Sequence, residues 1–550
     1  MAKNLILAAM ICCIACNAPV ATPGKNAKVA YSQPNILWLV AEDLSPYIPA
    51  FGDSTIATPN LSRLAEEGVL FTNVFSVSGV CAPSRAALAT GMYPTRIGAA
   101  HMRNTGQVRY LPEKIIPYEA MPPAEVKMHS EYLRRTGYYC TNNAKEDYQF
   151  KKSVTAWDES SPKAHWRNKK PGQPFFAIFN FGVTHESQIW VKSEDSLWVD
   201  AGLEVPIPPY LPDNEIGQKD VRRMYSNIVE MDFQVGEILK QLEEDGFLDN
   251  TIIFWYSDNG GPLPRQKRLL YDSGTKIPLI IRYPDKARAG ETDDRLISFV
   301  DFSSTILSMA GIEPPAYLDG RAFAGEFEDP SERKYVHGAA DRFDERYDMI
   351  RMVRDHQYLY LHNYRPEQGY YLPVKYREQM AVMQELLRLH DKGELNEIQA
   401  QWFRESKPEE ELFDTYMDPD NLHNLAADPA YGDKLEELRN ECERWIAETG
   451  DMGFISEKDY IESIWPGGIQ PVTEDPLITS DGEHLLITCP TEGASIGYQV
   501  LTGEQIPGDA WNVYTEPVKL NSGARVVAIA HRLGYQPSSQ VYFQQQAGQQ

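Results

Sequence analysis

A cysteine and an arginine four residues apart are the first pair in this chain whose types and spacing could do chemistry together. They bound the segment Cys81–Arg85, and Pro83 inside it suits the first turn of a helix that ends before Gly91. Residues four apart share a helix face, and a helix N-terminus attracts anions. The spacing therefore indicates a cysteine and a guanidinium beside an anion site, although a single cysteine is more often a buried structural residue.

Two pairs of oxygen donors could add a metal to this site. Glu42-Asp43 and Asp258-Asn259 together supply three carboxylates and an amide. Hard oxygen ligands of this kind suit Ca²⁺. Each pair alone is weak evidence, because an acidic pair at a strand end is often only a cap. Together with Cys81 and Arg85, the two pairs predict a calcium site beside the anion site.

Apolar runs place these residues at the ends of buried strands. The predicted strands include 35–41, 71–77, 174–183, 250–257 and 276–283, and the predicted helices include 58–68, 229–242 and 301–310. Glu42, His185 and Asp258 each follow one of the strands. Alternating strands and helices predict an α/β fold with a mostly parallel sheet, in which ligands bind beyond the carboxyl ends of the strands.

The pattern of apolar and polar residues changes after about residue 345. Residues 349–360 alternate like antiparallel strands, and helices are predicted over 376–404 and 434–449. Short strand candidates beyond Pro466 (485–488, 497–501, 513–518, 524–530 and 540–543) indicate an appended small β-sandwich. The predicted domains are therefore a catalytic domain at 34–345, a C-terminal α+β subdomain at 346–460 and the β-sandwich at 466–550.

Composition limits the class of partner. The 550 residues are enough for two or three domains. Lys and Arg number 53 against 78 Asp and Glu, and the net charge of −25 argues against a nucleic-acid partner, which needs a basic surface. An anionic ligand would need a local positive pocket inside this acidic shell.

The N-terminus is typical of an export signal. Lys3 precedes an apolar run from Leu5 to Ala15 that is too short to span a bilayer. We therefore predict a signal peptide at 1–22 and an exported protein. Cys13-Ile14-Ala15-Cys16 is similar to a bacterial lipobox, with Cys16 as the lipid-anchored residue. The predicted location is the periplasm or the outer membrane and cell surface as a lipoprotein, with plain secretion as the alternative.

The motifs resemble those of type I sulfatases of the alkaline phosphatase superfamily, over residues 34–455. The resemblance rests on three segments: Val40-Ala41-Glu42-Asp43-Leu44, the cysteine segment with Leu88, Thr90 and Gly91, and Tyr256-Ser257-Asp258-Asn259-Gly260. Glu42 stands where the family usually has aspartate. The resemblance implies an alkaline-phosphatase-like α/β sandwich with an antiparallel C-terminal subdomain.

The resemblance also assigns roles. It implies that a maturation enzyme oxidises Cys81 to formylglycine, an aldehyde whose hydrate attacks sulfur and later expels sulfate. It implies one Ca²⁺ held by Glu42, Asp43, Asp258, Asn259 and the modified Cys81. Further implied roles are Arg85 holding the modified residue, Lys145 and Lys267 binding sulfate, and His185 protonating the leaving oxygen.

One departure concerns deprotonation of the hydrate. Lys145 lies eight residues after Gly137, as in the family, but Asp147 stands where the family has histidine. Asp147 could replace that base, or Asn142 and Asn143 could bind in its place.

The expected substrate is a sulfated carbohydrate, with an algal polysaccharide such as ulvan, carrageenan or fucoidan preferred. His101 and Arg103, which follow the cysteine helix, are candidate substrate-binding residues, although a surface loop is an equal reading. Alternatives are a glycosaminoglycan or mucin sulfatase, a formylglycine-dependent phospho- or phosphonate-ester hydrolase, and an inactive carbohydrate-binding protein.

Overall fold

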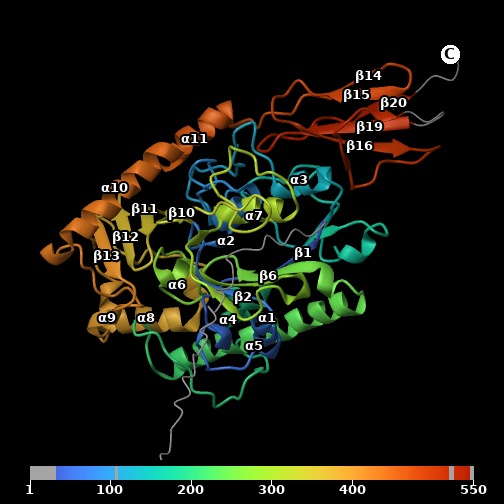
Figure 1. The fold of residues 1–550 in the computed structure, drawn as a ribbon. Coiled ribbons are helices and arrows are strands. Elements are labelled where there is room, and N and C mark those ends of the chain that lie inside the picture. The colour runs from blue at the N-terminus through green and yellow to red at the C-terminus, as the bar shows by residue number, and fades with distance from the viewer. Residues whose placement is uncertain (1–32, 106–109, 520–524, 545–550) are drawn as a thin grey trace, which may run out of the picture.

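The computed structural model describes residues 33–105, 110–519 and 525–544. The predicted signal peptide at 1–22, with Cys16, lies outside these residues. A nine-stranded sheet forms the centre of the described chain (Figure 1). Its strands are β1 (Asn35–Ala41), β2 (Val69–Phe75), β3 (Tyr139–Asn143), β4 (Glu159–Ser160), β5 (Phe175–Phe181), β6 (Thr251–Ser257), β7 (Lys276–Arg282), β8 (Glu291–Asp293) and β9 (Ile297–Ser298).

The sheet is mostly parallel, as predicted. The strand order is β4-β3-β5-β1-β6-β7-β2-β8, and β9 pairs with β2. Strand β7 is antiparallel to both of its neighbours, β6 and β2, and the other pairs are parallel. The carboxyl ends of β1, β3, β5 and β6 therefore lie along one edge.

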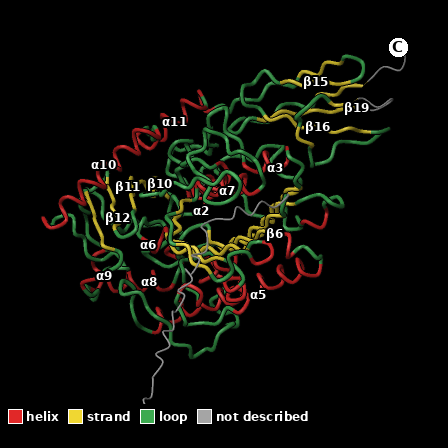
Figure 2. Tube along the Cα trace, viewed as in Figure 1, coloured by secondary structure: helices red, strands yellow, loops and turns green. Residues whose placement is uncertain are grey.

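Helices cover both faces of this sheet (Figures 1 and 2). One face carries α1 (Pro59–Glu66), α4 (Ser187–Val191) and α5 (Glu215–Glu244), and the other carries α2 (Cys81–Thr90), α3 (His129–Arg135) and α7 (Val300–Met309). Alternate residues of β1 serve the two cores: Trp38 packs with the α2 side and Leu39 with the α5 side. Burial on both faces explains why β1 is a continuous apolar run.

Helix α5 is longer than the predicted helix at 229–242. It begins after Asn214, whose side chain accepts hydrogen bonds from the N–H groups of Ile216 and Gly217. Such an N-cap is a start signal that the apolar periodicity alone does not contain.

A second, antiparallel sheet lies beside the first. It consists of β10 (Val336–Phe343), β11 (Arg346–Arg354), β12 (Tyr358–Asn363) and β13 (Glu410–Asp414), and α10 (Gly432–Thr449) packs on it. Strand β10 precedes the domain limit predicted at residue 345, yet it pairs with β11 beyond that limit.

The predicted helix at 376–404 is wrong as a single element. Two helices, α8 (Ala381–Lys392) and α9 (Glu397–Gln401), occupy the segment. Gly393 ends α8 in a left-handed conformation, with φ +67°, which breaks the helix. Two further helices are α6 (Asp272–Thr275) and α11 (Glu457–Ile464).

Two small antiparallel sheets complete the described chain. One contains β14 (Leu477–Ser480), β15 (His484–Thr488) and β18 (Val518–Lys519), and the other contains β16 (Ser495–Leu501), β17 (Asn512–Val513), β19 (Arg525–His531) and β20 (Val541–Gln544). Side chains of β15 and β19 share one core, which is the packing of a β-sandwich. The predicted strand at 513–518 is wrong, because its two ends belong to different sheets.

No helix in these described ranges combines the length and the hydropathy that crossing a membrane requires.

Candidate active site

The residues predicted to act together meet at one edge of the central sheet. Glu42 and Asp43 follow β1, Lys145 follows β3, His185 follows β5, and Asp258 and Asn259 follow β6. The ends of β1 and β6 are joined directly, because the Asp43 N–H donates to Asp258 Oδ1 at 3.2 Å. Only glycine fits at position 260, directly after Asn259, because a Cβ there would lie 2.4 Å from the Ser273 carbonyl oxygen. The topology therefore gathers side chains that are far apart in sequence.

Cys81 is the first residue of α2 and is 2% exposed. The N-cap residue Val80 makes no side-chain cap bond, which leaves the first N–H groups of the helix to face an anion. Burial raises the pKa of the Cys81 thiol to about 12, although the nearby Lys145 ammonium opposes the rise. An unmodified thiol is thus neutral at pH 7, and a neutral thiol is a poor nucleophile. This environment fits a cysteine that acts only after modification.

Arg85 joins the helix to two strands. Its Nε donates to Asp258 Oδ2 at 2.8 Å and its Nη1 donates to Asn180 Oδ1 at 2.7 Å. Burial alone would raise the pKa of Asp258, but Arg85 and then Lys145 outweigh it and lower the pKa, so the carboxylate stays charged. Arg85 Nη2 is buried without a partner in the described chain. The guanidinium therefore keeps donor capacity for an anion.

Lys145 is the second cation at the site. Its Nζ donates to Glu42 Oε2 at 2.7 Å and lies 3.9 Å from both Asp147 Oδ2 and Asp258 Oδ2. Burial would lower the pKa of Lys145, but the nearby carboxylates of Glu42 and Asp258 help to raise it overall. Lys145 is therefore an ammonium at neutral pH.

Asp147 lies beside this group, and the two asparagines that could replace it are otherwise engaged. The Asp147 side chain is 34% exposed, and its charge is close enough to raise the pKa of Cys81. Asn142 Nδ2 donates to the Lys145 carbonyl, while Asn143 Nδ2 donates to the carbonyls of Pro162 and Ala164. Both asparagine amides are used in hydrogen bonds to these carbonyls. Asp147 is therefore the residue of the three that is available to accept a proton.

Lys267 is the third cation and the most enclosed. Its Nζ lies 2.6 Å from Asp43 Oδ2, 3.3 Å from Glu186 Oε1 and 3.2 Å from His185 Nε2. Burial opposes its charge, but Asp43 and Glu186 raise the pKa of Lys267 above its usual value. The ammonium therefore holds two carboxylates and the imidazole in one cluster.

His185 is neutral at pH 7 in this state of the protein. Its Nε2 lies 3.2 Å from the Lys267 ammonium, which can only donate, so Nε2 accepts and the proton of the neutral ring lies on Nδ1, which donates to Ser187 Oγ at 2.8 Å. Burial, followed by the charge of Lys267, lowers the pKa of His185 to about 3. A general acid must be the imidazolium. The negative charge of a sulfate ester bound beside Nε2 would raise the pKa of His185 and so favour the imidazolium.

Two sets of donors could hold a metal ion. Asp43, His185 and Glu186 place their ligand atoms within 4.8 Å of one another. The Lys267 ammonium already lies among these three groups, which disfavours a second cation there.

The carboxylates of the predicted calcium set are also ion-paired, with Lys145, Lys267 and Arg85, but of the two sets only this one includes a buried oxygen that is unpaired within the described chain. Glu42, Asp43 and Asp258 supply carboxylates, and Asn259 Nδ2 donates to Asp43 Oδ1 at 3.1 Å. Asn259 Oδ1 is buried with no partner among the described residues. An unsatisfied buried carbonyl oxygen beside carboxylates suits a hard cation. Ligation by the modified Cys81 remains a prediction.

The structure separates the two candidate substrate residues. Arg103 pairs with Asp344, and its guanidinium lies 4.7 Å from the Tyr376 ring, which in turn lies 6.2 Å from the His185 ring. His101 is directed elsewhere, into a cavity whose lining includes none of the cations around Cys81. Arg103 therefore belongs to the surroundings of His185, and His101 does not.

Three residues of the cluster were missed by sequence reasoning. Asn180 binds Arg85 from within β5, and a polar residue inside an apolar strand is a signal that could have found it. Glu186 donates its N–H to Asp43 Oδ2 at 2.7 Å, and Arg268 binds the Glu186 carboxylate through two hydrogen bonds of 2.8 Å. No local pattern identifies the last two, because their partners are distant in sequence.

Comparison with known proteins agrees with this geometry. The sulfatase family model matches residues 34–312, and the model for the C-terminal region of N-sulphoglucosamine sulphohydrolase matches residues 265–402. The chain is 51% identical to an ulvan-active sulfatase of Formosa agariphila, over 92% of this chain and 91% of that protein. It is 25% identical to human N-sulphoglucosamine sulphohydrolase, over 80% of this chain and 95% of that protein.

Solved structures share the fold. A protein solved with D-glucosamine-2-N,6-O-disulfate matches with a TM-score of 0.55 and 18% identity, over 76% of this chain and 98% of that one. A 2-O GAG sulfatase matches with a TM-score of 0.56 and 20% identity, over 76% and 93%. These likenesses confirm the alkaline-phosphatase-like fold predicted from the motifs. By its family model, its relatives and its fold, the chain belongs to the sulfatase family and is a sulfatase.

Proposed function

We propose that this sulfatase removes sulfate from a sulfated polysaccharide of the ulvan type, through a formylglycine made from Cys81. The observation that supports the reaction site is the convergence of Arg85, Lys145 and Lys267 around the N-terminus of α2. Three charged donors and a helix N-terminus suit a tetrahedral anion. The substrate class is supported by the 51% identity to an ulvan-active sulfatase.

The charges of the site also support a metal. Four enclosed carboxylates (Glu42, Asp43, Glu186 and Asp258) are paired with four cations (Arg85, Lys145, Lys267 and Arg268), and the more exposed Asp147 adds a further negative charge. A sulfate ester would increase this excess of negative charge, and a divalent cation would compensate it. Glu42, Asp43, Asp258 and Asn259 would hold Ca²⁺. That ion would supply Lewis-acid stabilisation of negative oxygen, and the aldehyde would supply a hydrated nucleophile.

The protein's own residues then divide the work. Arg85, fixed by Asp258 and Asn180, orients the modified residue 81. Lys145 and Lys267 hold sulfate oxygens, and Asp147 accepts a proton from the hydrate in place of the family's histidine. His185 Nε2 faces the leaving oxygen and delivers a proton once substrate charge has raised its pKa.

The deciding experiment measures sulfate release by matured protein from ulvan, chondroitin sulfate and heparan sulfate, with Cys81→Ala as the inactive control. We expect the highest kcat/KM with ulvan. Faster release from either glycosaminoglycan would overturn the ulvan assignment. A matched pair of aryl sulfate and aryl phosphate esters tests the reaction type. A higher kcat/KM on the phosphate would refute the assignment as a sulfate-ester hydrolase.

The proposal includes export and lipid attachment at Cys16, because an enzyme that acts on a polysaccharide encounters its substrate outside the cell. Labelling with a radioactive fatty acid in the native host, compared with a Cys16→Ala variant, tests the anchor. Equal labelling of both proteins would refute it.

A further inference from the structure

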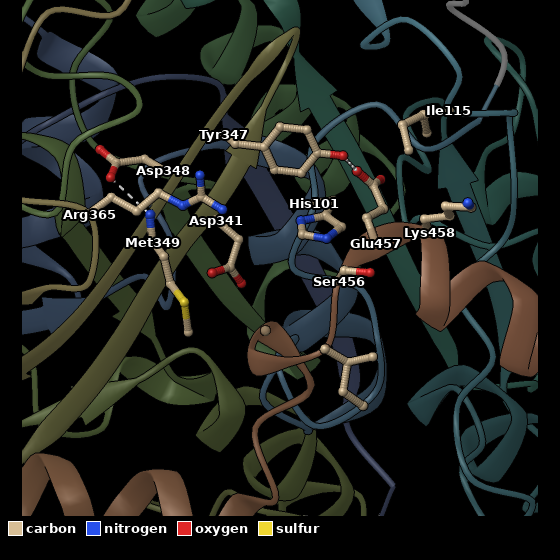
Figure 3. A pocket seen from close by; sticks show the side chains of 12 residues that line it. His101, Ile115, Asp341, Tyr347, Asp348, Met349, Arg365, Ser456, Glu457 and Lys458 are labelled. Atoms are coloured by element: carbon tan, nitrogen blue, oxygen red, sulfur yellow. Dashed lines mark hydrogen bonds between the residues drawn. The ribbon is translucent and has the colours of Figure 1, made fainter. Parts of the chain in front are cut away.

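A cavity of about 270 Å³ lies in the C-terminal part of the molecule, apart from the cluster at Cys81. His101, Tyr347 and residues next to the start of α11 line it (Figure 3). The Tyr347 and His101 rings pack edge to face, with centroids 6.2 Å apart. Ile115, Met349 and Ile455 add apolar surface. Aromatic and apolar surface beside a few polar groups is typical of a site that binds a small ligand unit.

The carboxylates that line the cavity form ion pairs with cations that do not line it. Asp341 accepts from Arg351 at 2.8 Å, and Asp348 accepts from Lys407 at 2.7 Å. Glu457 accepts two hydrogen bonds of 2.8 Å from the buried guanidinium of Arg342. The acidic residues of the lining therefore carry little uncompensated charge.

Two cations of the lining have no such partner. Arg365 and Lys458 are exposed, and within the described part of the chain neither side chain makes an ion pair or a hydrogen bond. Figure 3 shows Tyr347 and His101 between them in this view, with Arg365 beside Asp348 and Lys458 beside Ile115. The cavity thus has two available positive groups on a floor that is otherwise neutral.

His101 adds a directed donor. Its Nδ1 accepts from the Arg342 N–H at 3.2 Å, so the proton of the neutral ring lies on Nε2. Burial keeps this ring neutral, because it lowers the pKa of His101. Within the described ranges, the hydrogen bond of the ring is the one at Nδ1, and Nε2–H makes none. It can therefore donate to a ligand oxygen.

The cavity and the catalytic cluster flank the same short segment. His101 enters the cavity, Met102 N–H donates to the Arg342 carbonyl on β10, and Arg103 turns back to Asp344. Arg103 has φ +62°, which reverses the chain between the two sites. A saccharide chain that passes this segment can contact both.

We propose that the cavity around His101 is a second saccharide-binding site for an acidic sugar, one that bears a carboxylate or a sulfate group. It holds one unit of the polymer through Arg365, Lys458 and His101 while the sulfate ester of another unit lies at Cys81. The choice of a polymeric acidic ligand rests on the proposed function; the position and charge of the site do not.

The test is an Arg365→Glu/Lys458→Glu double variant. Its control is Lys163→Glu/Lys240→Glu, which makes the same change in net charge at exposed lysines away from the cavity. The ratio of the KM for ulvan to the KM for 4-nitrocatechol sulfate is measured for both. We expect the double variant to raise this ratio about fivefold or more over the control, since two exposed charge pairs become repulsive. An equal ratio in the two proteins would overturn the second site.

A second readout separates this inference from the proposed function. If matured protein releases no sulfate from ulvan, the proposed substrate fails, and migration in native gels that contain ulvan still tests the cavity. We expect ulvan to retard the wild type and the control equally, and to retard the double variant less. Equal retardation of all three proteins, or of none, would overturn the inference.

Discussion

The catalytic cluster and the His101 cavity use charge in opposite ways. At Cys81 the cations are enclosed and paired: Lys267 is 2% exposed, and Asp43 and Asp258 are 0% exposed. In the cavity the carboxylates are paired, while Arg365 and Lys458 are exposed. Burying paired charges is costly, yet it fixes geometry, whereas exposed charges attract a ligand without fixing it. The difference is what we expect if one region performs the chemistry and the other holds the polymer from which sulfate is removed.

The largest expected effect is at Asp258. Asp258→Asn keeps the shape of the side chain but removes a charge that binds Arg85 and is available to a metal. We expect kcat/KM for an aryl sulfate to fall at least about 10³-fold, because metal-assisted charge stabilisation amounts to several kcal/mol. Glu194→Gln, which breaks an exposed ion pair with Lys219, serves as the control. A near-wild-type rate for Asp258→Asn, with little bound metal in either protein, would refute the metal assignment.

His185 gives the next largest effect, and it depends on the leaving group. If His185 protonates the leaving oxygen, His185→Gln should lower kcat for a saccharide sulfate about 10²-fold. The loss should be much smaller for 4-nitrocatechol sulfate, whose phenolate leaves without a proton. Steady-state kinetics on the two substrates measures this. Equal losses on both would show that His185 only positions substrate.

Asp147 gives a smaller effect, because it is the least enclosed charge of the cluster. We expect Asp147→Ala to lower kcat about tenfold, below the usual range for a lost base, since solvent can reach the site. Asp147→His would restore the family's usual residue and should recover part of the loss. Wild-type kinetics for Asp147→Ala would exclude Asp147 as the base.

The cavity variants give the smallest expected effect on turnover, a change of about fivefold in the KM ratio for ulvan, since exposed charge pairs contribute little. They sharpen the comparison because they act on substrate affinity alone. A large fall in kcat for the aryl sulfate would instead show that the cavity residues contribute to the catalytic step.

Apolar runs were sufficient to predict the central sheet and its active edge. Asn35–Ala41 and Thr251–Ser257 are buried on both faces, and strands of that kind are readable as continuous apolar segments. The residues that follow them, such as Asp43 and Asn259, were therefore predictable as site members. The antiparallel direction of β7 was not, because a strand's direction depends on pairing with distant strands.

The rest of the site depends on long-range contacts. Glu186 and Arg268 meet across 82 positions, and no local spacing encodes such a pair. His101 and Arg103 are close in sequence, but their side chains diverge: Met102 is fixed to β10, and the left-handed backbone of Arg103 directs its side chain to Asp344. Sequence pattern can predict what lies at a strand end, but not which side chains reach it from other segments.

The modification of residue 81 is the central claim, and mass spectrometry tests it most directly. The peptide that contains residue 81 is quantified in preparations with different degrees of maturation, and kcat for an aryl sulfate is measured on the same samples. We predict that kcat rises in proportion to the fraction of peptide that carries the aldehyde, and that Cys81→Ala is inactive. Full activity in protein whose Cys81 is an unmodified thiol would contradict the account.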